Sequence, residues 1–203
     1  VDHFLQQDKC SRVIAECAVS TSIVFIAARF ASNAVVDFPN IARQVINQIG
    51  YEQHAFNGKT CSIITSLKEL PDEEYCCFDE KKLSEEEIEA VPVKNQVTLF
   101  GFACNQTSAL MPLPIWLAHR LARRLTSVRL QKILSYLAPD GKTQVGVEYK
   151  KRRPYRIHSI TVIASQSRPL ASGGPDLKSL RDNIMEAVIN PVFQDEDIKP
   201  DAE

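Results

Sequence analysis

The chain has 203 residues, of which 44% are hydrophobic and 24% charged, the proportions of an ordinary soluble globular protein. A formal net charge of −1 gives no global positive field, so a nucleic-acid partner is not expected and any basic surface would have to be local. No secretory signal opens the chain, and its longest apolar run, residues 23–28, is too short to cross a bilayer. The sequence therefore predicts a cytoplasmic protein without a membrane partner.

The cysteines do not form a metal-binding or disulfide framework. No two of them are spaced as a CxxC pair, and the four histidines lie far from any such arrangement, so a zinc site is not predicted. Adjacent cysteines in an acidic stretch favour free thiols in a reducing compartment over a disulfide scaffold. The six positions are Cys10, Cys17, Cys61, Cys76, Cys77 and Cys104.

The first third of the chain alternates between short helices and strands. Residues 1–9 are typical of the end of a helix, and residues 12–19 and 21–28 predict a hairpin whose second strand is buried on both faces. An extended piece at 35–38 precedes a helix over 41–49, which Gly50 ends. Asn57-Gly58 predicts a turn before a strand over 60–66.

Residues 68–94 are acidic and have no apolar face of their own. The pattern predicts a surface loop with a short helix over 84–90, which Ser84 and Glu87 begin as a capping box. Long loops in compact domains often act as lids, so both a passive and a functional loop are retained as hypotheses.

A strand over 97–104 and a long helix from about 113–115 to 134 are predicted next. Leucines at 117, 121 and 125 and a valine at 128 form one buried stripe, and Pro112 and Pro114 mark its start. Arginines on the opposite face, Arg120, Arg123, Arg124 and Arg129, are expected to be mostly solvated.

A turn over 138–141 is predicted to lead into a strand over 144–149, followed by a strand over 156–165 and a helix over 177–189 that Asn190-Pro191 ends. Asp140 and Lys142 flank Gly141 in this turn, and a carboxylate beside an ammonium can bind a metal and a phosphate together. Such turns are also common without any ligand.

The order of elements predicts an α+β fold, with mainly antiparallel sheets covered by helices on one face. We expect a first domain over 1–105 that carries the acidic lid-like loop 68–94, and a second, incomplete unit over 106–203.

Several ordered motifs resemble one family. They are IGY at 49–51, FNGKTC at 56–61, LFGFA at 99–103, LMPLPI at 110–115, LAHRL at 117–121 and PDGKTQV at 139–145. In order and spacing they resemble methionine adenosyltransferase, also called S-adenosylmethionine synthetase, over nearly all of the chain. The resemblance implies a three-domain α+β subunit in dimers with active sites between subunits. It also implies a reaction of ATP with methionine that releases phosphate and pyrophosphate and depends on Mg²⁺ and K⁺.

The same resemblance assigns roles to individual residues. Glu16 matches the family's potassium ligand, and Asp140 and Lys142 match its nucleotide and phosphate contacts. Other positions depart from the family pattern. These altered positions are Arg29 for a methionine-contacting glutamate, Tyr75 for a glutamine of the gating loop, Asn95 for the aspartate of a GDQG motif, and Ser167 for a histidine.

Segments that complete the family's phosphate site would precede Val1 and follow Glu203. Together with the altered positions, this predicts a truncated, degenerate member that acts as a non-catalytic subunit, as a homodimer or beside a complete synthetase subunit. Two alternatives are a fragment of a nucleotide-dependent transferase with a different acceptor, and a binding module that uses the arginine face for an acidic partner.

Overall fold

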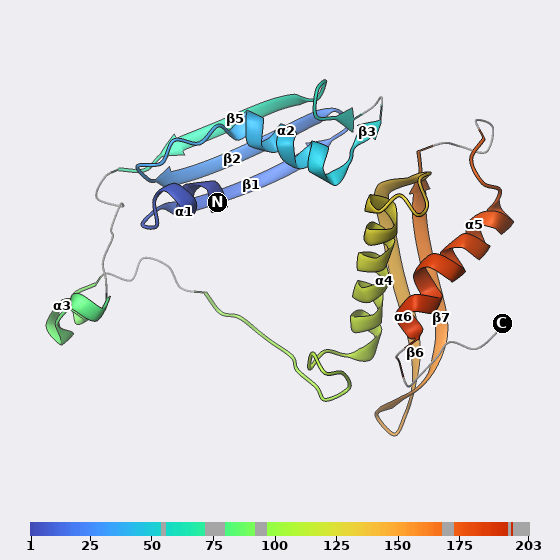
Figure 1. Ribbon diagram of the computed structural model, residues 1–203. Helices are drawn as coiled ribbons and strands as arrows, with labels where there is room; N and C mark the ends of the chain where they lie inside the picture. Colours follow the sequence, from blue (N-terminus) through green and yellow to red (C-terminus); the bar gives the residue numbers. More distant parts are fainter. Residues whose placement is uncertain (54–55, 72–79, 92–96, 168–172, 195, 197–203) are drawn as a thin grey trace. The chain divides into compact units, whose positions relative to one another are not determined.

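The computed structural model describes residues 1–53, 56–71, 80–91, 97–167, 173–194 and 196. The chain divides into two compact units, Val1–Thr98 and Leu99–Glu203, and each is considered by itself (Figure 1). Within the described ranges, no helix combines the length and the apolar character that crossing a bilayer requires.

The first unit is built on a three-stranded sheet in the order β1-β2-β5. Its elements are α1 (Asp2–Gln7), β1 (Arg12–Ser20), β2 (Ile23–Ala31), α2 (Phe38–Ile49), β3 (Glu52–Gln53), β4 (Phe56–Asn57) and β5 (Ser62–Glu69). The predicted hairpin is confirmed as the antiparallel pair β1 and β2. Strand β5 runs parallel to β2, and α2 supplies the crossover that parallel neighbours need.

The prediction that the second hairpin strand is buried on both faces is wrong. Val24, Ile26 and Ala28 are buried, whereas Ile23 and Phe25 on the opposite face are 43% and 41% exposed. The buried face forms a core with α2 and Cys61, and the other face has no helix against it among the described residues. The continuous apolar run in β2 therefore forms a strand of a sheet that is covered on one face only.

Helix α2 has the boundaries that its sequence chemistry favours. The Asp37 carboxylate accepts a hydrogen bond from Asn40 N at 3.0 Å, and Pro39 fits in the first turn. Gly50 ends the helix at φ 91°, a left-handed conformation that glycine adopts without a Cβ penalty, as predicted. The helix begins at Phe38, so the extended piece expected at 35–38 is shorter than predicted.

One cysteine departs from the expected free thiols. Among the described residues Cys17, Cys61 and Cys104 are free, whereas Cys10 is disulfide-bonded. The adjacent pair on which the free-thiol prediction rested, Cys76 and Cys77, lies outside the described residues, so for that pair it stays a prediction. A disulfide joins cysteines that the fold brings together, and spacing along the chain does not show this.

The acidic stretch contains the short helix that was expected. The 3₁₀ turn Glu80–Lys82 precedes α3 (Glu85–Glu89). Glu87 N donates to Ser84 Oγ at 3.3 Å and Ser84 N donates to Glu87 Oε2 at 2.9 Å, so the capping box is confirmed. The lid hypothesis for this stretch stays a prediction.

The strand predicted at 97–104 is absent from these described residues. Leu99, Phe100 and Phe102 are 87%, 96% and 76% exposed. Alternating apolar residues form a strand only beside a neighbouring strand, and none pairs with them here. The strand prediction is therefore wrong for these residues.

The second unit packs three helices and a π-helical turn against a long hairpin. Its elements are α4 (Leu113–Leu130), β6 (Leu137–Lys150), β7 (Arg153–Gln166), α5 (Leu177–Ile184), the π-turn Met185–Ile189 and α6 (Asn190–Phe193). The predicted stripe of α4 is confirmed, because Leu117, Leu121 and Val128 are fully buried in one core with β6, β7 and the C-terminal helices. The helix ends four residues earlier than predicted.

The turn predicted at 138–141 is wrong. Residues 137–141 belong to β6, and Gly141 pairs with Ala164 and Lys142 with Ile163 in β7. Pro139 cannot donate a ladder hydrogen bond, and the register shifts between Leu137 and Gly141. The turn-like composition therefore corresponds to an irregularity inside a strand and not to a turn.

The last helix does not stop at Asn190-Pro191 as predicted. The π-turn lets Asn190 N donate to Met185 O, five residues back. Pro191 then falls in the first turn of α6, where its missing N–H costs no hydrogen bond. The helical path therefore continues to Phe193.

The β6–β7 hairpin closes with the two-residue turn Lys151-Arg152 between the paired residues Lys150 and Arg153. Both turn residues have positive φ, 50° and 64°, as a type I′ turn requires. A left-handed conformation costs a residue with a Cβ roughly 1 kcal/mol, so Asn-Gly would fit more favourably here.

The predicted α+β class with mainly antiparallel sheets is confirmed. The pairs β1–β2, β3–β4 and β6–β7 are antiparallel, and only β2–β5 is parallel within the described residues.

The cap of α5 gives a pH-dependent prediction. A hydrogen bond from Ser179 N to Asp176 Oδ1, at 2.7 Å, lowers the pKa of Asp176 below its usual value. Because this pKa is lower in the folded state, the cap stabilises fully above the usual pKa and is lost as pH falls through the folded pKa. We expect a carboxyl NMR titration of Asp176 to have a lower midpoint in the folded chain than in urea. Equal midpoints would contradict the cap.

Candidate functional site

Asp140 and Lys142 project from one face of β6. They are two residues apart in a strand, both are exposed, and Lys142 lies opposite Ile163, itself 56% exposed. Gly141 and Thr143 face the other way, since Gly141 lies against Leu125 of α4 and Thr143 Oγ1 donates to Ala118 O of α4 at 2.8 Å. The two charged groups therefore lie on the sheet face opposite α4.

Gly141 explains this orientation. A Cβ at Gly141 would lie 2.7 Å from Leu125 Cδ2 and 3.3 Å from Ile163 O. The closer of these contacts is with the end of a flexible side chain, so a larger residue at position 141 would require Leu125 to shift where β6 approaches α4. Gly141 thus packs against α4, and its two neighbours in the chain, Asp140 and Lys142, carry opposite charges.

A cavity beneath Gly141 is too small for a nucleotide. It has a volume of about 70 Å³ and is lined by Leu125, Arg129 and Pro139, among others. Ligand pockets usually exceed roughly 300 Å³. A ligand of Asp140 and Lys142 would therefore bind on the open sheet face and not in this cavity.

A larger groove lies between β7 and α5. Its volume is about 680 Å³, and it is lined by Ile160, Val162, Leu180 and Ile184, with Arg156 and Arg181. Asp140 and Lys142 do not line it. The nucleotide-sized hollow and the two predicted phosphate contacts are therefore separate features of the second unit.

Glu16 and Arg29 share one face of the first unit's sheet. Glu16 lies opposite Ala27, two residues before Arg29, on the face away from the Val24 core. Arg29 lies beside Lys68 in the parallel ladder with β5. Arg29, one of the positions predicted to be altered, therefore stands next to a second cation, which sequence reasoning missed because residues 29 and 68 are far apart in the chain.

The remaining predicted positions are only partly described. Tyr75 and Asn95 lie outside the described residues. Ser167 follows β7, where its N and Oγ donate to Tyr136 O at 2.8 and 3.1 Å. Its contacts join the end of β7 to the segment before β6. Among the described residues no group of three His, Cys, Asp or Glu side chains could hold a metal ion.

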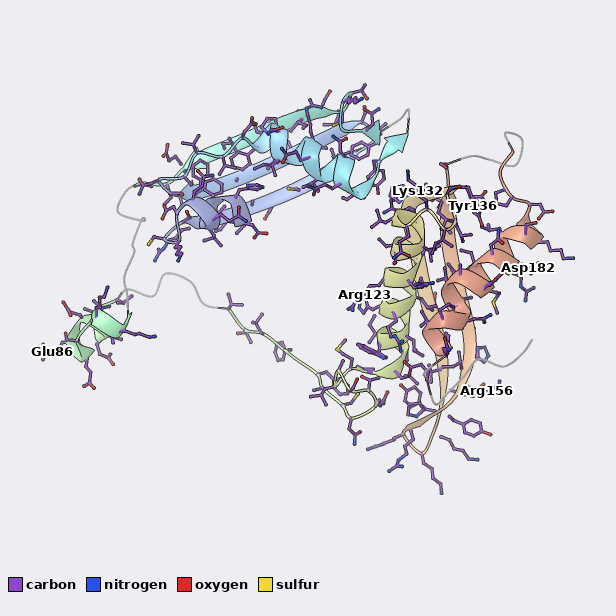
Figure 2. All side chains as sticks on the ribbon, in the orientation of Figure 1. Glu86, Arg123, Lys132, Tyr136, Arg156 and Asp182 are labelled. Carbon is purple, nitrogen blue, oxygen red and sulfur yellow. The ribbon has the colours of Figure 1, made fainter. Side chains whose placement is uncertain are left out.

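The arginine face of α4 is less solvated than expected. Arg120 forms an ion pair with Glu196, and Arg124 Nε donates to Ala187 O at 2.8 Å. Arg123 is exposed and projects from the side of α4 away from β6 and β7 (Figure 2). Two of these arginines thus tie α4 to the C-terminal segment, which leaves less of this face for an acidic partner.

Comparison with protein families assigns both units. Residues 1–71 match the N-terminal domain of S-adenosylmethionine synthetase, and residues 90–203 match its central domain. The chain belongs to the S-adenosylmethionine synthetase family. Within this transferase family, Glu16 and Arg29 fall in the N-terminal domain match, and Asp140 and Lys142 in the central domain match. Tyr75 lies between the two matched ranges.

Proposed function

We propose that this S-adenosylmethionine synthetase-family chain binds the triphosphate of a nucleotide but activates methionine poorly, and that it serves as a non-catalytic subunit, with a second copy or with a complete synthetase subunit. One observation carries the proposal: Arg29 stands beside Lys68 where the family resemblance implies a carboxylate for methionine. Two adjacent cations repel the substrate's ammonium group, whereas a carboxylate attracts it.

The nucleotide part rests on the exposed pair on β6. Lys142 can neutralise a phosphate oxygen, and Asp140 can contribute one carboxylate to a magnesium ion whose other ligands are phosphate oxygens and water. A magnesium ion held there by Asp140 would reduce the charge of the bound triphosphate. This single carboxylate fits the usual way in which proteins hold Mg²⁺ beside phosphates.

The potassium part fits less well. Glu16 is exposed, and its partner across the β1–β2 pair is Ala27, whose side chain has no oxygen atom. This pair therefore supplies no second side-chain oxygen for a potassium ion beside the Glu16 carboxylate. We therefore assign no step to K⁺ and propose Glu16 only as a contributor of one ligand.

The nucleotide proposal is tested by calorimetric titration with ATP and Mg²⁺. We expect Lys142→Ala to weaken binding by roughly ten- to a hundredfold, because a charge-assisted hydrogen bond contributes about 1.5–3 kcal/mol. Gln144→Ala is the matched control, since Gln144 is exposed two residues further along the same strand. Absence of ATP binding by the unaltered chain would overturn this part of the proposal.

The catalytic part is tested by S-adenosylmethionine formation from ATP and methionine. We expect a rate far below that of a working enzyme, which has a typical kcat of about 1 s⁻¹ or more. A chain that turned over at such a rate alone would contradict impaired catalysis. Light scattering with and without a complete synthetase subunit then shows whether the chain pairs with itself or with that subunit.

A second candidate follows from the same two cations. Arg29 and Lys68 would attract an acceptor that carries an extra negative charge, which makes the chain a nucleotide-dependent transferase with an altered acceptor. The variant Arg29→Glu should then lower the rate at which triphosphate is released from ATP when an anionic thioether is the acceptor. No change in that rate would rule this candidate out.

A further inference from the structure

The tip of the β6–β7 hairpin carries the densest positive charge among the described residues of the second unit. Lys150, Lys151, Arg152 and Arg153 are consecutive and all exposed. Arg156 follows on β7, where it is ion-paired with Glu148 at 3.0 Å. We define the hairpin tip as residues 149–156. It holds five cations and no carboxylate of its own; Glu148, directly before it, pairs with Arg156.

The backbone holds these cations in a fixed arrangement. Lys150 and Arg153 pair across the hairpin, and Lys151 and Arg152 occupy both central positions of the turn with positive φ. Asn and Gly are the residues that such a turn favours. The sequence instead places two cations there, so turn chemistry alone does not explain them.

Aromatic rings accompany the charges. Tyr155 is 60% exposed, and Lys150 Nζ lies 5.3 Å from the centre of its ring. Tyr149 is 43% exposed, and its hydroxyl donates to Gln106 Oε1 at 2.8 Å, which fixes its position. Figure 2 shows the side chains spreading outward from the turn, below Arg156.

We propose that the hairpin tip is a docking site for single-stranded nucleic acid. Lysine and arginine side chains would neutralise successive phosphates, and the exposed tyrosine rings would stack with bases. This function is independent of the nucleotide proposal for β6 and lies outside the chemistry of the family. A net charge of −1 argued against nucleic acid for the chain as a whole, but the local charge of the tip is opposite in sign.

The arrangement favours nucleic acid over other anionic partners. A membrane surface would be matched by exposed aliphatic side chains beside the cations, and the tip presents tyrosines instead. Receptor proteins that bind a basic segment in an extended conformation cannot accommodate these residues, because they are paired in a hairpin with a closed turn. An acidic peptide would pair with the cations but leave the tyrosine rings unused.

The test is fluorescence anisotropy of a labelled oligouridylate of about 20 nucleotides, titrated with the full chain between about 50 and 200 mM salt. The variant Lys151→Asn/Arg152→Gly removes two cations and provides the residues that the turn favours, so it is not expected to unfold. We expect affinity to fall at least tenfold at the lowest salt. The slope of log affinity against log salt should decrease by about 1.4, since each phosphate contact to a single strand contributes about 0.7.

Two further variants separate the contributions. Arg123→Gln/Lys178→Gln removes the same charge from exposed positions elsewhere in the second unit and should leave binding within about twofold. Tyr155→Leu should weaken binding without changing the salt slope. No binding at the lowest salt would overturn the proposal. An equal loss in the control pair would also overturn it, as would hairpin-dependent binding to phosphatidylserine vesicles without binding to the oligonucleotide.

Discussion

Replacing Leu121 by alanine is expected to lower the free energy of unfolding of the second unit by about 3–5 kcal/mol. Leu121 is fully buried in the centre of α4, in one core with Leu117, Val128 and Val145. Truncation removes apolar contacts and leaves a cavity that surrounding helices and strands fill only in part. Urea unfolding followed by Trp116 fluorescence measures the loss, because Trp116 packs against this core and is the chain's single tryptophan.

The matched control is Leu130→Ala. Leu130 lies on the same helix but is 57% exposed, so its truncation should change stability by no more than about 0.5 kcal/mol. If both variants lost the same stability, the loss would not come from the burial of Leu121 in the core, since alanine is at least as good a helix former as leucine at both positions. An unchanged Leu121→Ala would show that α4 is not packed on β6 and β7 in solution.

Local signals predicted the helices well. The stripe of Leu117, Leu121 and Val128, the capping box of Ser84 and the C-terminal Gly50 each depend on residues within a few positions of one another. Such interactions are present in the sequence before any tertiary structure forms. The helices were therefore placed to within a few residues.

Pairing between distant residues was predicted less well. The composition around Pro139 indicated a turn, but β7 holds that segment in a long strand. The apolar alternation around Phe100 indicated a strand, but no neighbour pairs with it among the described residues. Strand formation depends on partners elsewhere in the chain, which a local pattern does not identify.

The candidate site shows the same division. Asp140 and Lys142 could be predicted as neighbours, because only Gly141 separates them. Their common face followed only from the packing of Gly141 against Leu125. The cationic pair of Arg29 and Lys68 results from the parallel ladder between β2 and β5, so no local pattern around either residue predicts it.

A substitution at Gly58 is expected to destabilise the first unit. Gly58 is buried, and a Cβ there would lie 2.9 Å from Arg43 O and closer still to Asn47 Oδ1. Arg43 Nη1 also donates to Gly58 O at 2.6 Å, so α2 and the turn cannot separate without losing this bond. We expect Gly58→Ala to destabilise the unit by about 2–3 kcal/mol, through overpacking against a helix backbone. Hydrogen exchange of the α2 amides measures this loss.

Two comparisons make the cause of that loss testable. Gly101→Ala is the matched control, since a Cβ at Gly101 meets nothing within 4 Å, and it should leave exchange in α2 unchanged. Adding Asn47→Ala to Gly58→Ala removes the amide clash but keeps the backbone oxygen of Arg43. Because a side chain can move and a helix carbonyl cannot, we expect only partial rescue. Full rescue would assign the whole effect to Asn47, and no loss in Gly58→Ala would show that α2 does not pack on the Asn57-Gly58 turn in solution.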